Sequence, residues 1–197
     1  MQPLTEPALP GAPRSRSFAR NGALGMALFV FTEVMLFAGF ISAFSINQAA
    51  AIPGSWPPPG QPRLPIERTA FNTVALLLSG AALYLGGRRF RKSGAGSAEP
   101  YVGAALVLGA FFVVSQGMEW VALLRHGLTL TSSQLGSFFY VIVGTHALHA
   151  VAAIIALATG WGLMRARRLP DSGFAAIELF WYFVVLIWPV LYWKVYL

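Results

Sequence analysis

The chain has 197 residues, of which 56% are hydrophobic and only 11% are charged. A soluble fold of this size cannot bury so many apolar side chains, so the composition predicts one compact integral membrane domain. The absence of cysteine excludes disulfides, thiolate metal sites, iron–sulfur clusters and cysteine nucleophiles. The formal charge of +7 could indicate a nucleic-acid-binding protein, but the positions of the basic residues favour another explanation.

Five apolar runs are each long enough to cross a bilayer as a helix, because a hydrocarbon core about 30 Å thick requires about 20 residues. We therefore expect an all-α bundle of five transmembrane helices. The segment before them, residues 1–20, is rich in Pro, Ser and Arg and is expected to be a disordered cytoplasmic arm, while residues 21–197 form the membrane domain. The expected spans are residues 23–44, 70–87, 101–124, 138–163 and 174–193.

The basic residues are distributed unequally between the two sides of such a bundle. With a cytoplasmic N-terminus and an outer C-terminus, ten lie on the inner side and four on the outer side. This is the positive-inside bias, and it explains the high pI without a nucleic acid partner. The ten are Arg14, Arg16, Arg20, Arg88, Arg89, Arg91, Lys92, Arg165, Arg167 and Arg168, and the four are Arg63, Arg68, Arg125 and Lys194.

Two connections carry strong turn signals. Residues 45–67 are rich in proline and are expected to form an extended outer loop without helix. Residues 93–97 contain two glycines and are expected to form a flexible inner turn. Pro189, inside the last run, should bend that helix or end its regular part.

Glu33 lies at the centre of the first run and is the only charged residue among residues 23–44. A carboxyl group in the middle of a bilayer costs about 2.5 kcal/mol or more on insertion scales. Such a residue normally faces other helices and has a polar partner there. Glu33 therefore predicts a polar site inside the bundle.

The third run has a polar edge formed by Ser115, Gln116 and Glu119, because Glu119 follows the other two at the helical spacings of four and three. Two interpretations remain open for this edge. Gln116 and Glu119 either bond to a neighbouring helix or to Arg125, or they take part in chemistry. A further acid, Glu178, lies near the inner start of the last run, where water or a partner subunit is expected to reach it.

His146 and His149 lie on one face of the fourth run. Histidines three residues apart can bind a metal or accept a proton, although a purely structural role is the more common one. Two axial ligands of a haem usually come from different helices, and the only other histidine is His126, at the outer end of the third run. Zinc or copper would need further ligands from Glu33 and Glu119. We therefore expect neither metal nor haem in this chain.

The depths of Glu33 and His149 in the membrane are compatible with contact between them. At about 1.5 Å per residue, Glu33 lies roughly 15 Å from the inner end of its helix, and His149 lies roughly 21 Å from the inner end of its own. We therefore hypothesise that the two side chains share a hydrogen bond or an ion pair, which would offset much of the cost of burying them.

These segments together resemble subunit III of the haem–copper oxidases, the cytochrome c oxidase polypeptide III family, in its short five-helix bacterial form. The resemblance covers nearly everything from Arg20 to the end of the chain. The segments that carry it are residues 31–41 (FTEVMLFAGFI), 67–80 (ERTAFNTVALLLSG), 116–120 (QGMEW), 136–140 (GSFFY), 144–150 (GTHALHA) and 180–188 (FWYFVVLIW).

The resemblance implies five helices equivalent to the last five of longer seven-helix relatives, and no redox centre in this chain. It implies a non-catalytic subunit of the bacterial cytoplasmic membrane that packs against catalytic subunit I, which holds haem and copper. It also implies bound phospholipid and support of proton uptake, which protects the oxidase during turnover. Glu33 matches the family's buried, carbodiimide-reactive glutamate, and His146 and His149 match its paired histidines.

On this basis we expect two groups of site residues. The buried polar group, associated with proton uptake or lipid, is Glu33, His146, His149, Glu119 and Gln116. The group in contact with lipid or a partner subunit is Trp181, Tyr182, Trp188 and Arg68. For the aromatic residues of the last run, an ordinary interfacial belt of Trp and Tyr is an equally weighted alternative.

The last run departs from the family pattern at two positions. The family usually has Tyr-Trp-His-Phe-Val-Asp there, whereas this chain has Tyr182 in place of the histidine and Val185 in place of the aspartate. The two substitutions are typical of a variant with a rebuilt polar contact. The Tyr182 hydroxyl can still form hydrogen bonds, and the Val185 side chain cannot.

Other functions remain open from the sequence. The chain could be a subunit-III-like accessory protein of a nitric oxide reductase. A small membrane cytochrome b or a small transporter is less favoured, because the polar residues in the spans are few and scattered.

Overall fold

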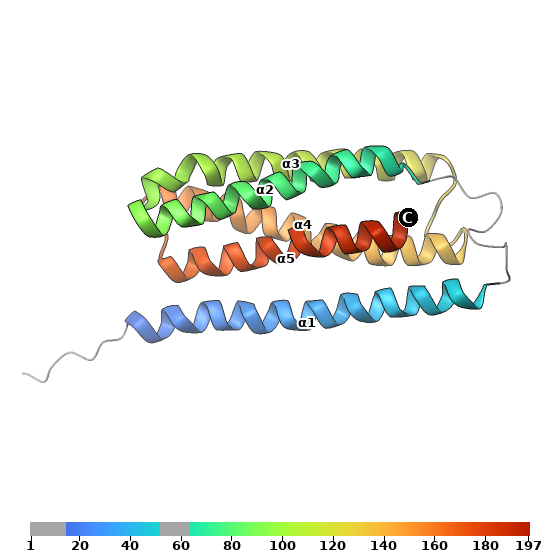
Figure 1. Ribbon diagram of the computed structural model, residues 1–197, viewed down its shortest axis with the longest axis horizontal. Coiled ribbons are helices and arrows are strands. Elements are labelled where there is room, and N and C mark those ends of the chain that lie inside the picture. Colours follow the sequence, from blue (N-terminus) through green and yellow to red (C-terminus); the bar gives the residue numbers. More distant parts are fainter. Residues whose placement is uncertain (1–14, 52–63) are drawn as a thin grey trace, which may run out of the picture.

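The computed structural model describes residues 15–51 and 64–197, with side chains from residue 22 onward. Five long helices run back and forth along one axis (Figure 1). All five are long and apolar enough to cross a membrane, which confirms the predicted all-α membrane bundle. The helices are α1 Ser15–Ala50, α2 Ile66–Ser93, α3 Ala95–Arg125, α4 Gln134–Arg165 and α5 Asp171–Tyr196.

The helices extend beyond the apolar runs at both ends. Helix α1 begins at Ser15, inside the segment expected to be a disordered arm, whose remaining residues 1–14 lie outside the described part. Residues 45–67 were expected to contain no helix, and this expectation is wrong at both ends of the segment. Helix α1 continues to Ala50, and α2 already begins at Ile66. Residues 52–63, in the centre of the segment, lie outside the described part.

The glycine-rich inner connection is shorter than expected. Only Gly94 separates α2 from α3, and its φ of 81° is a backbone conformation that other residues rarely adopt. The next glycine, Gly96, is already helical. Helix α5 continues through Pro189 to Tyr196, so this proline does not end it.

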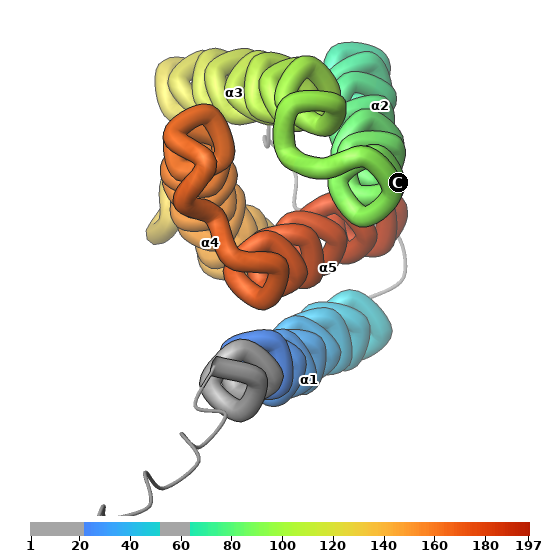
Figure 2. Tube along the Cα trace, turned by 90° about the vertical axis from the view of Figure 1, so that its left-hand side faces the viewer, coloured from blue at the N-terminus to red at the C-terminus, as the bar shows by residue number. Residues whose placement is uncertain are grey.

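Helices α2, α3, α4 and α5 surround a common interior, and α1 lies outside this ring (Figure 2). Among the described residues, α1 contacts only α5 and α4. The ring closes through α2–α3, α3–α4, α4–α5 and α2–α5 contacts. Any polar group on α1 that needs a partner must therefore find it on α4 or α5.

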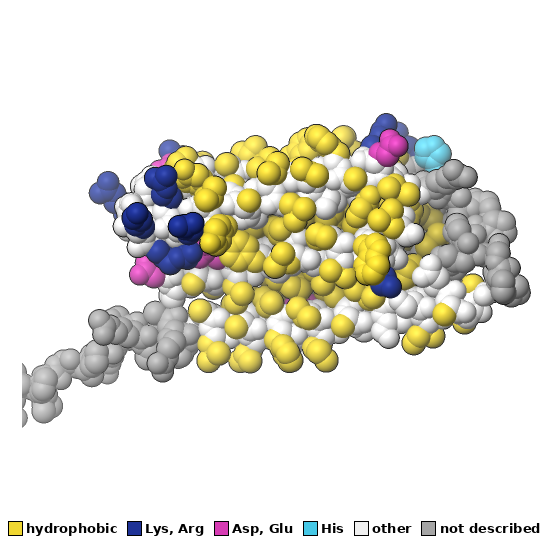
Figure 3. All heavy atoms as spheres, in the orientation of Figure 1, with side chains coloured by type: hydrophobic (Ala, Val, Ile, Leu, Met, Phe, Trp, Pro, Cys, Tyr) yellow, Lys and Arg dark blue, Asp and Glu magenta, His cyan; other side chains and the backbone are white. Residues whose placement is uncertain are grey.

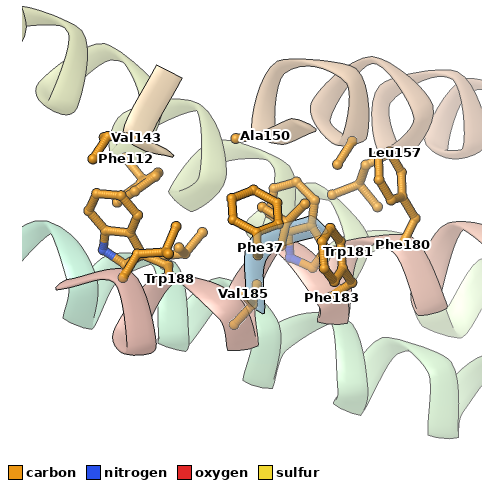
Figure 4. Close-up of a cluster of buried hydrophobic side chains, with 14 of the residues drawn as sticks. Phe37, Phe112, Val143, Ala150, Leu157, Phe180, Trp181, Phe183, Val185 and Trp188 are labelled. Atoms are coloured by element: carbon orange, nitrogen blue, oxygen red, sulfur yellow. The ribbon is translucent and has the colours of Figure 1, made fainter. Parts of the chain in front are cut away.

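Large aromatic side chains fill the interior of the ring. Trp181, Trp188 and Phe112 are fully buried, and the Phe112 and Trp188 ring centroids lie 5.0 Å apart (Figure 4). Glycines on α2 and α3 allow the close approach this packing needs, because lipid supplies no hydrophobic drive for helix association. A Cβ atom on Gly109 would collide with the Trp181 indole, and one on Gly80 would lie 2.9 Å from Val185 Cγ1.

Hydrophobic side chains cover the visible middle of the molecule, while Lys and Arg gather at its ends (Figure 3). Many large apolar side chains of the chain are exposed, including Phe31, Phe71 and Leu186. A band of this kind is expected where helices face hydrocarbon rather than water.

Candidate functional site

Glu33 of α1 points toward α4 and meets His149. The distance from Glu33 Oε2 to His149 Nε2 is 3.1 Å, and the two side chains are 16% and 12% exposed. The contact predicted from the depths of the two residues is therefore present. The imidazole lies among phenylalanine rings, with Phe37 and Phe183 at centroid distances of 5.7 and 5.9 Å.

The hydrogen bonds of His149 determine where its protons lie. Nδ1 is 2.7 Å from the Thr145 carbonyl oxygen, and a carbonyl oxygen only accepts, so Nδ1 carries a hydrogen. In a neutral imidazole Nε2 is then an acceptor, and it faces a carboxyl oxygen that is also an acceptor when ionised. The 3.1 Å contact becomes a hydrogen bond only with one further proton, on Nε2 or on the carboxyl group. The geometry thus favours a pair that shares one proton.

His146 faces a different part of the bundle. Its side chain is 1% exposed, and its ring stacks on Trp188 at a centroid distance of 4.8 Å. Phe37 contacts both imidazoles, at 6.4 Å from His146 and 5.7 Å from His149. The shared face predicted from their spacing would have allowed both histidines to bind one ligand. In the structure they face different neighbours and do not converge on one ligand. Within residues 15–51 and 64–197, no three His, Cys, Asp or Glu side chains lie close enough to hold a metal ion.

The polar edge of α3 bonds to neighbouring helices. Gln116 accepts a hydrogen bond from Asn72 Nδ2 at 3.4 Å and donates one to the Tyr196 hydroxyl at 3.0 Å. Glu119 forms an ion pair of 3.5 Å with Arg68, and not with Arg125. The structure thus supports the neighbouring-helix interpretation of this edge. Arg68 is otherwise exposed, so its ion pair with Glu119 contributes little to stability.

Two tryptophans expected at a lipid or partner contact are inside the bundle instead. Trp181 Nε1 donates to Ser79 Oγ at 3.1 Å, and Trp188 Nε1 donates to Thr73 Oγ1 at 2.9 Å. Both indoles are buried, so the expected contact with lipid or a partner subunit is wrong for these two residues, and so is an interfacial-belt role for them. The hydroxyls on α2 satisfy indole N–H groups that would otherwise be unpaired in an apolar interior.

Tyr182 and Val185, the two departures from the family pattern, occupy different environments. The Tyr182 hydroxyl donates to Glu178 Oε1 at 3.3 Å, so a polar contact is present at this position. Val185 is buried and packs on Gly80, which places its side chain inside this chain rather than at a partner surface.

Glu178 is a polar centre that the sequence interpretation missed. Water or a partner was expected to reach it, but it is only 6% exposed and its Oε2 accepts a hydrogen bond from Arg91 Nη1 at 2.8 Å. A Cβ atom at Gly87 would occupy the space of the Glu178 carboxyl group. The spacing of four residues between Glu178 and Tyr182 was the available signal, because such residues meet on one helix face.

Comparison with known proteins gives a consistent result. The sequence model of the family "Cytochrome c oxidase subunit III" matches residues 11–197. A "Cytochrome c oxidase subunit 3" of Pelomedusa subrufa is 31% identical, over 91% of this chain and 70% of that protein. A "Cytochrome c oxidase subunit 3" of a Synechocystis strain is 29% identical, over 88% of this chain and 74% of that protein. A "Probable cytochrome c oxidase subunit 3" of Nocardia farcinica is 30% identical, over 88% of this chain and 86% of that protein.

Proposed function

Because the chain belongs to the cytochrome c oxidase subunit III family, we propose that it packs against the catalytic subunit of a haem–copper terminal oxidase and supports proton uptake by that enzyme. In this proposal the chain works in a bacterial cytoplasmic membrane, and the haem and copper belong to partner subunits. The observation that carries the proposal is the contact between Glu33 and His149.

A pair that shares one proton is suited to this role. With the proton on the imidazole it is an ion pair, and with the proton on the carboxyl group it consists of two neutral groups. Its net charge is zero in both arrangements, so neither leaves an isolated charge in the apolar interior.

Bound phospholipid is the second part of the proposal. A groove of about 280 Å³ lies between α1 and α5, with Val30, Val34 and Leu186 among its lining residues. Its walls are almost entirely apolar side chains, which is the chemistry of an acyl chain. Tyr182 also lines this groove, so its hydroxyl contact with Glu178 lies beside the proposed chain.

The proposal is tested by Glu33→Gln in the purified oxidase. Oxygen consumption in a short assay should be nearly unchanged, because the chemistry takes place in another subunit. The lifetime under continuous turnover should become several-fold shorter, because a glutamine cannot share a proton with His149.

The matched control is Glu119→Gln, which removes a carboxylate whose only described ion pair is with an exposed arginine and should leave that lifetime unchanged. Two results would contradict the proposal: an immediate total loss of activity with the subunit still assembled, or a lifetime equal to that of the wild type. A haem spectrum of the complex purified through a tag on this chain distinguishes a terminal oxidase from a nitric oxide reductase.

A further inference from the structure

An open groove of about 680 Å³ follows the exposed face of α3, in the half of this helix that ends at Arg125. Its walls are mainly apolar, and among the described residues that line it none is acidic. The side chains of Val114, Met118 and Val121 line it and are 62%, 64% and 49% exposed, so they do not belong to the packed interior. The groove shares no lining residue with the one between α1 and α5.

Gly117 lies in the middle of this groove. A Cβ atom added to Gly117 would meet no atom within 4 Å, whereas one on Gly109 of the same helix would collide with the Trp181 indole. Glycine inside a helix is unfavourable, because it loses more conformational freedom on folding than other residues do. Packing within the described part of the chain explains Gly109 but not Gly117. The space beside Gly117 is therefore available to a group from outside the chain.

The exposed guanidinium group of Arg125 stands at the end of the groove without a partner. Its position in the last turn of α3 is electrostatically favourable, but among the described residues it has no ion pair and no hydrogen bond. The other described basic residues at this end of the bundle are engaged. Arg68 pairs with Glu119, and Lys194 Nζ lies 4.9 Å from the centroid of the Trp193 ring. The N–H donors of Arg125 are thus available to an anion.

His126 adds a second nitrogen group at the same end of the groove. Its Nδ1 lies 2.7 Å from the Ala122 carbonyl oxygen, which only accepts, so Nδ1 carries a hydrogen. The remaining nitrogen, Nε2, belongs to an exposed side chain and can take up a proton and then donate a hydrogen bond. Arg125 and His126 together match a phosphate group, which a guanidinium binds through two parallel hydrogen bonds.

The length of the groove indicates which molecule fits it. Arg125 follows Val114 by eleven residues, or about 16 Å of helix, which is roughly half of a hydrocarbon core about 30 Å thick. A partner helix would cross both halves of the bilayer, whereas an acyl chain occupies only one. We infer that this groove binds an anionic phospholipid of the leaflet at this end, with an acyl chain beside Gly117 and its phosphate at Arg125 and His126. The inference does not depend on the proposed role of Glu33.

Native mass spectrometry of the complex, purified in detergent through a tag on this chain, tests the inference. The complex is titrated with phosphatidylglycerol and, separately, with phosphatidylcholine that carries the same acyl chains. Gly117→Leu should lower the number of tightly bound phosphatidylglycerol molecules by one, because the new side chain fills the groove. Arg125→Gln should weaken the binding of that molecule about fivefold, which is the contribution of one basic residue beside anionic lipid. Phosphatidylcholine binding should change much less, because its headgroup has no net charge.

Lys194→Gln is the matched control, because it removes an equal charge at the same end of the bundle but outside the groove, and it should bind phosphatidylglycerol as the wild type does. An equal loss in Lys194→Gln and Arg125→Gln would show a general attraction to surface charge and would overturn the inference. Unchanged binding by Gly117→Leu would overturn it as well. A cryo-EM map of the wild-type complex gives a test without variants: acyl-chain density that ends at Arg125 is expected, and a partner helix packed over Gly117 would contradict it.

Discussion

Several polar side chains inside this bundle are held by partners on other helices. The Trp181 indole donates to Ser79 Oγ, and Ser79 in turn donates to the Ala105 carbonyl oxygen at 2.8 Å. One hydroxyl thus joins α2, α3 and α5. Hydrogen bonds of this kind between membrane helices average about 0.6 kcal/mol, with larger values where a buried donor would otherwise be left unpaired.

Ser79→Ala should therefore destabilise the subunit by about 1 kcal/mol, because it leaves the Trp181 N–H without an acceptor. Unfolding of the purified chain in mixed detergent micelles, followed by tryptophan fluorescence, measures this change. Trp181→Phe in the Ser79→Ala background should add less than Trp181→Phe does alone. Equal effects in both backgrounds would show that the Ser79–Trp181 bond contributes nothing.

The sequence predicted the surroundings of some residues and not of others. Glu33 was identifiable because a lone charge in an apolar run requires a partner, and helical depth indicated His149 as that partner. The direction in which the His146 side chain points could not be predicted in this way. Two helical residues three positions apart differ in direction by about 60°, so their side chains can contact different neighbours. The burial of Trp181 and Trp188 depends on which face of α5 meets the ring, which composition alone does not reveal.

Whole helices depend on small residues at close crossings. Gly109 of α3 lies directly against the Trp181 ring of α5, and Gly160 of α4 lies against Ile177 of α5. A side chain at either position would push the helices apart. The bundle is thus held together by shape at these crossings and by the hydrogen bonds described above.

Gly109→Ala should destabilise the subunit by about 1–3 kcal/mol, because overpacking forces the Trp181 ring out of its position. The same micelle unfolding experiment measures the loss. Gly162→Ala on α4 is the matched control, since no other residue approaches within 4 Å of the added methyl group. A Gly109→Ala variant as stable as this control would contradict the close packing.

Helix existence was predictable, and helix ends were less so. The apolar runs identified the five described helices, because each run alone is long enough to cross a bilayer. The extensions of the helices into polar sequence, such as residues 45–50 of α1, could not be predicted, because the same polar residues also occur in loops. At the start of α4 a signal was available: Ser133 Oγ accepts a hydrogen bond from the Gly136 N–H at 3.0 Å, an N-cap of the usual kind.

For the whole molecule, the distribution of basic residues predicts which end of the bundle is cytoplasmic. Arg91 and Lys92 lie in the last turn of α2, and Arg165 lies in the last turn of α4. Seven of the 14 Lys and Arg residues lie at or just beyond these two helix ends. We expect them on the inner side, where basic residues are favoured.

The absence of native cysteine makes this orientation measurable. A membrane-impermeant maleimide applied to intact cells should label His126→Cys, at the end of α3, and should not label Ser93→Cys, at the end of α2. Both variants should be labelled after the membrane is opened, which is the control for accessibility. The reverse pattern in intact cells would show that the bundle has the opposite orientation.

Helix α1 lies outside the ring and contacts only α4 and α5 within the described part of the chain, and the contact between Glu33 and His149 is the ion pair that joins it to α4 there. The direct measurement is a double-mutant cycle of Glu33→Leu and His149→Leu on the thermal stability of the assembled subunit. Each single change should destabilise by more than about 1 kcal/mol, because it leaves the other polar group alone in apolar surroundings, and the double change should cost less than their sum by about 1–2 kcal/mol. Additive effects, or a gain in stability from His149→Leu alone, would contradict the pairing on which the account depends.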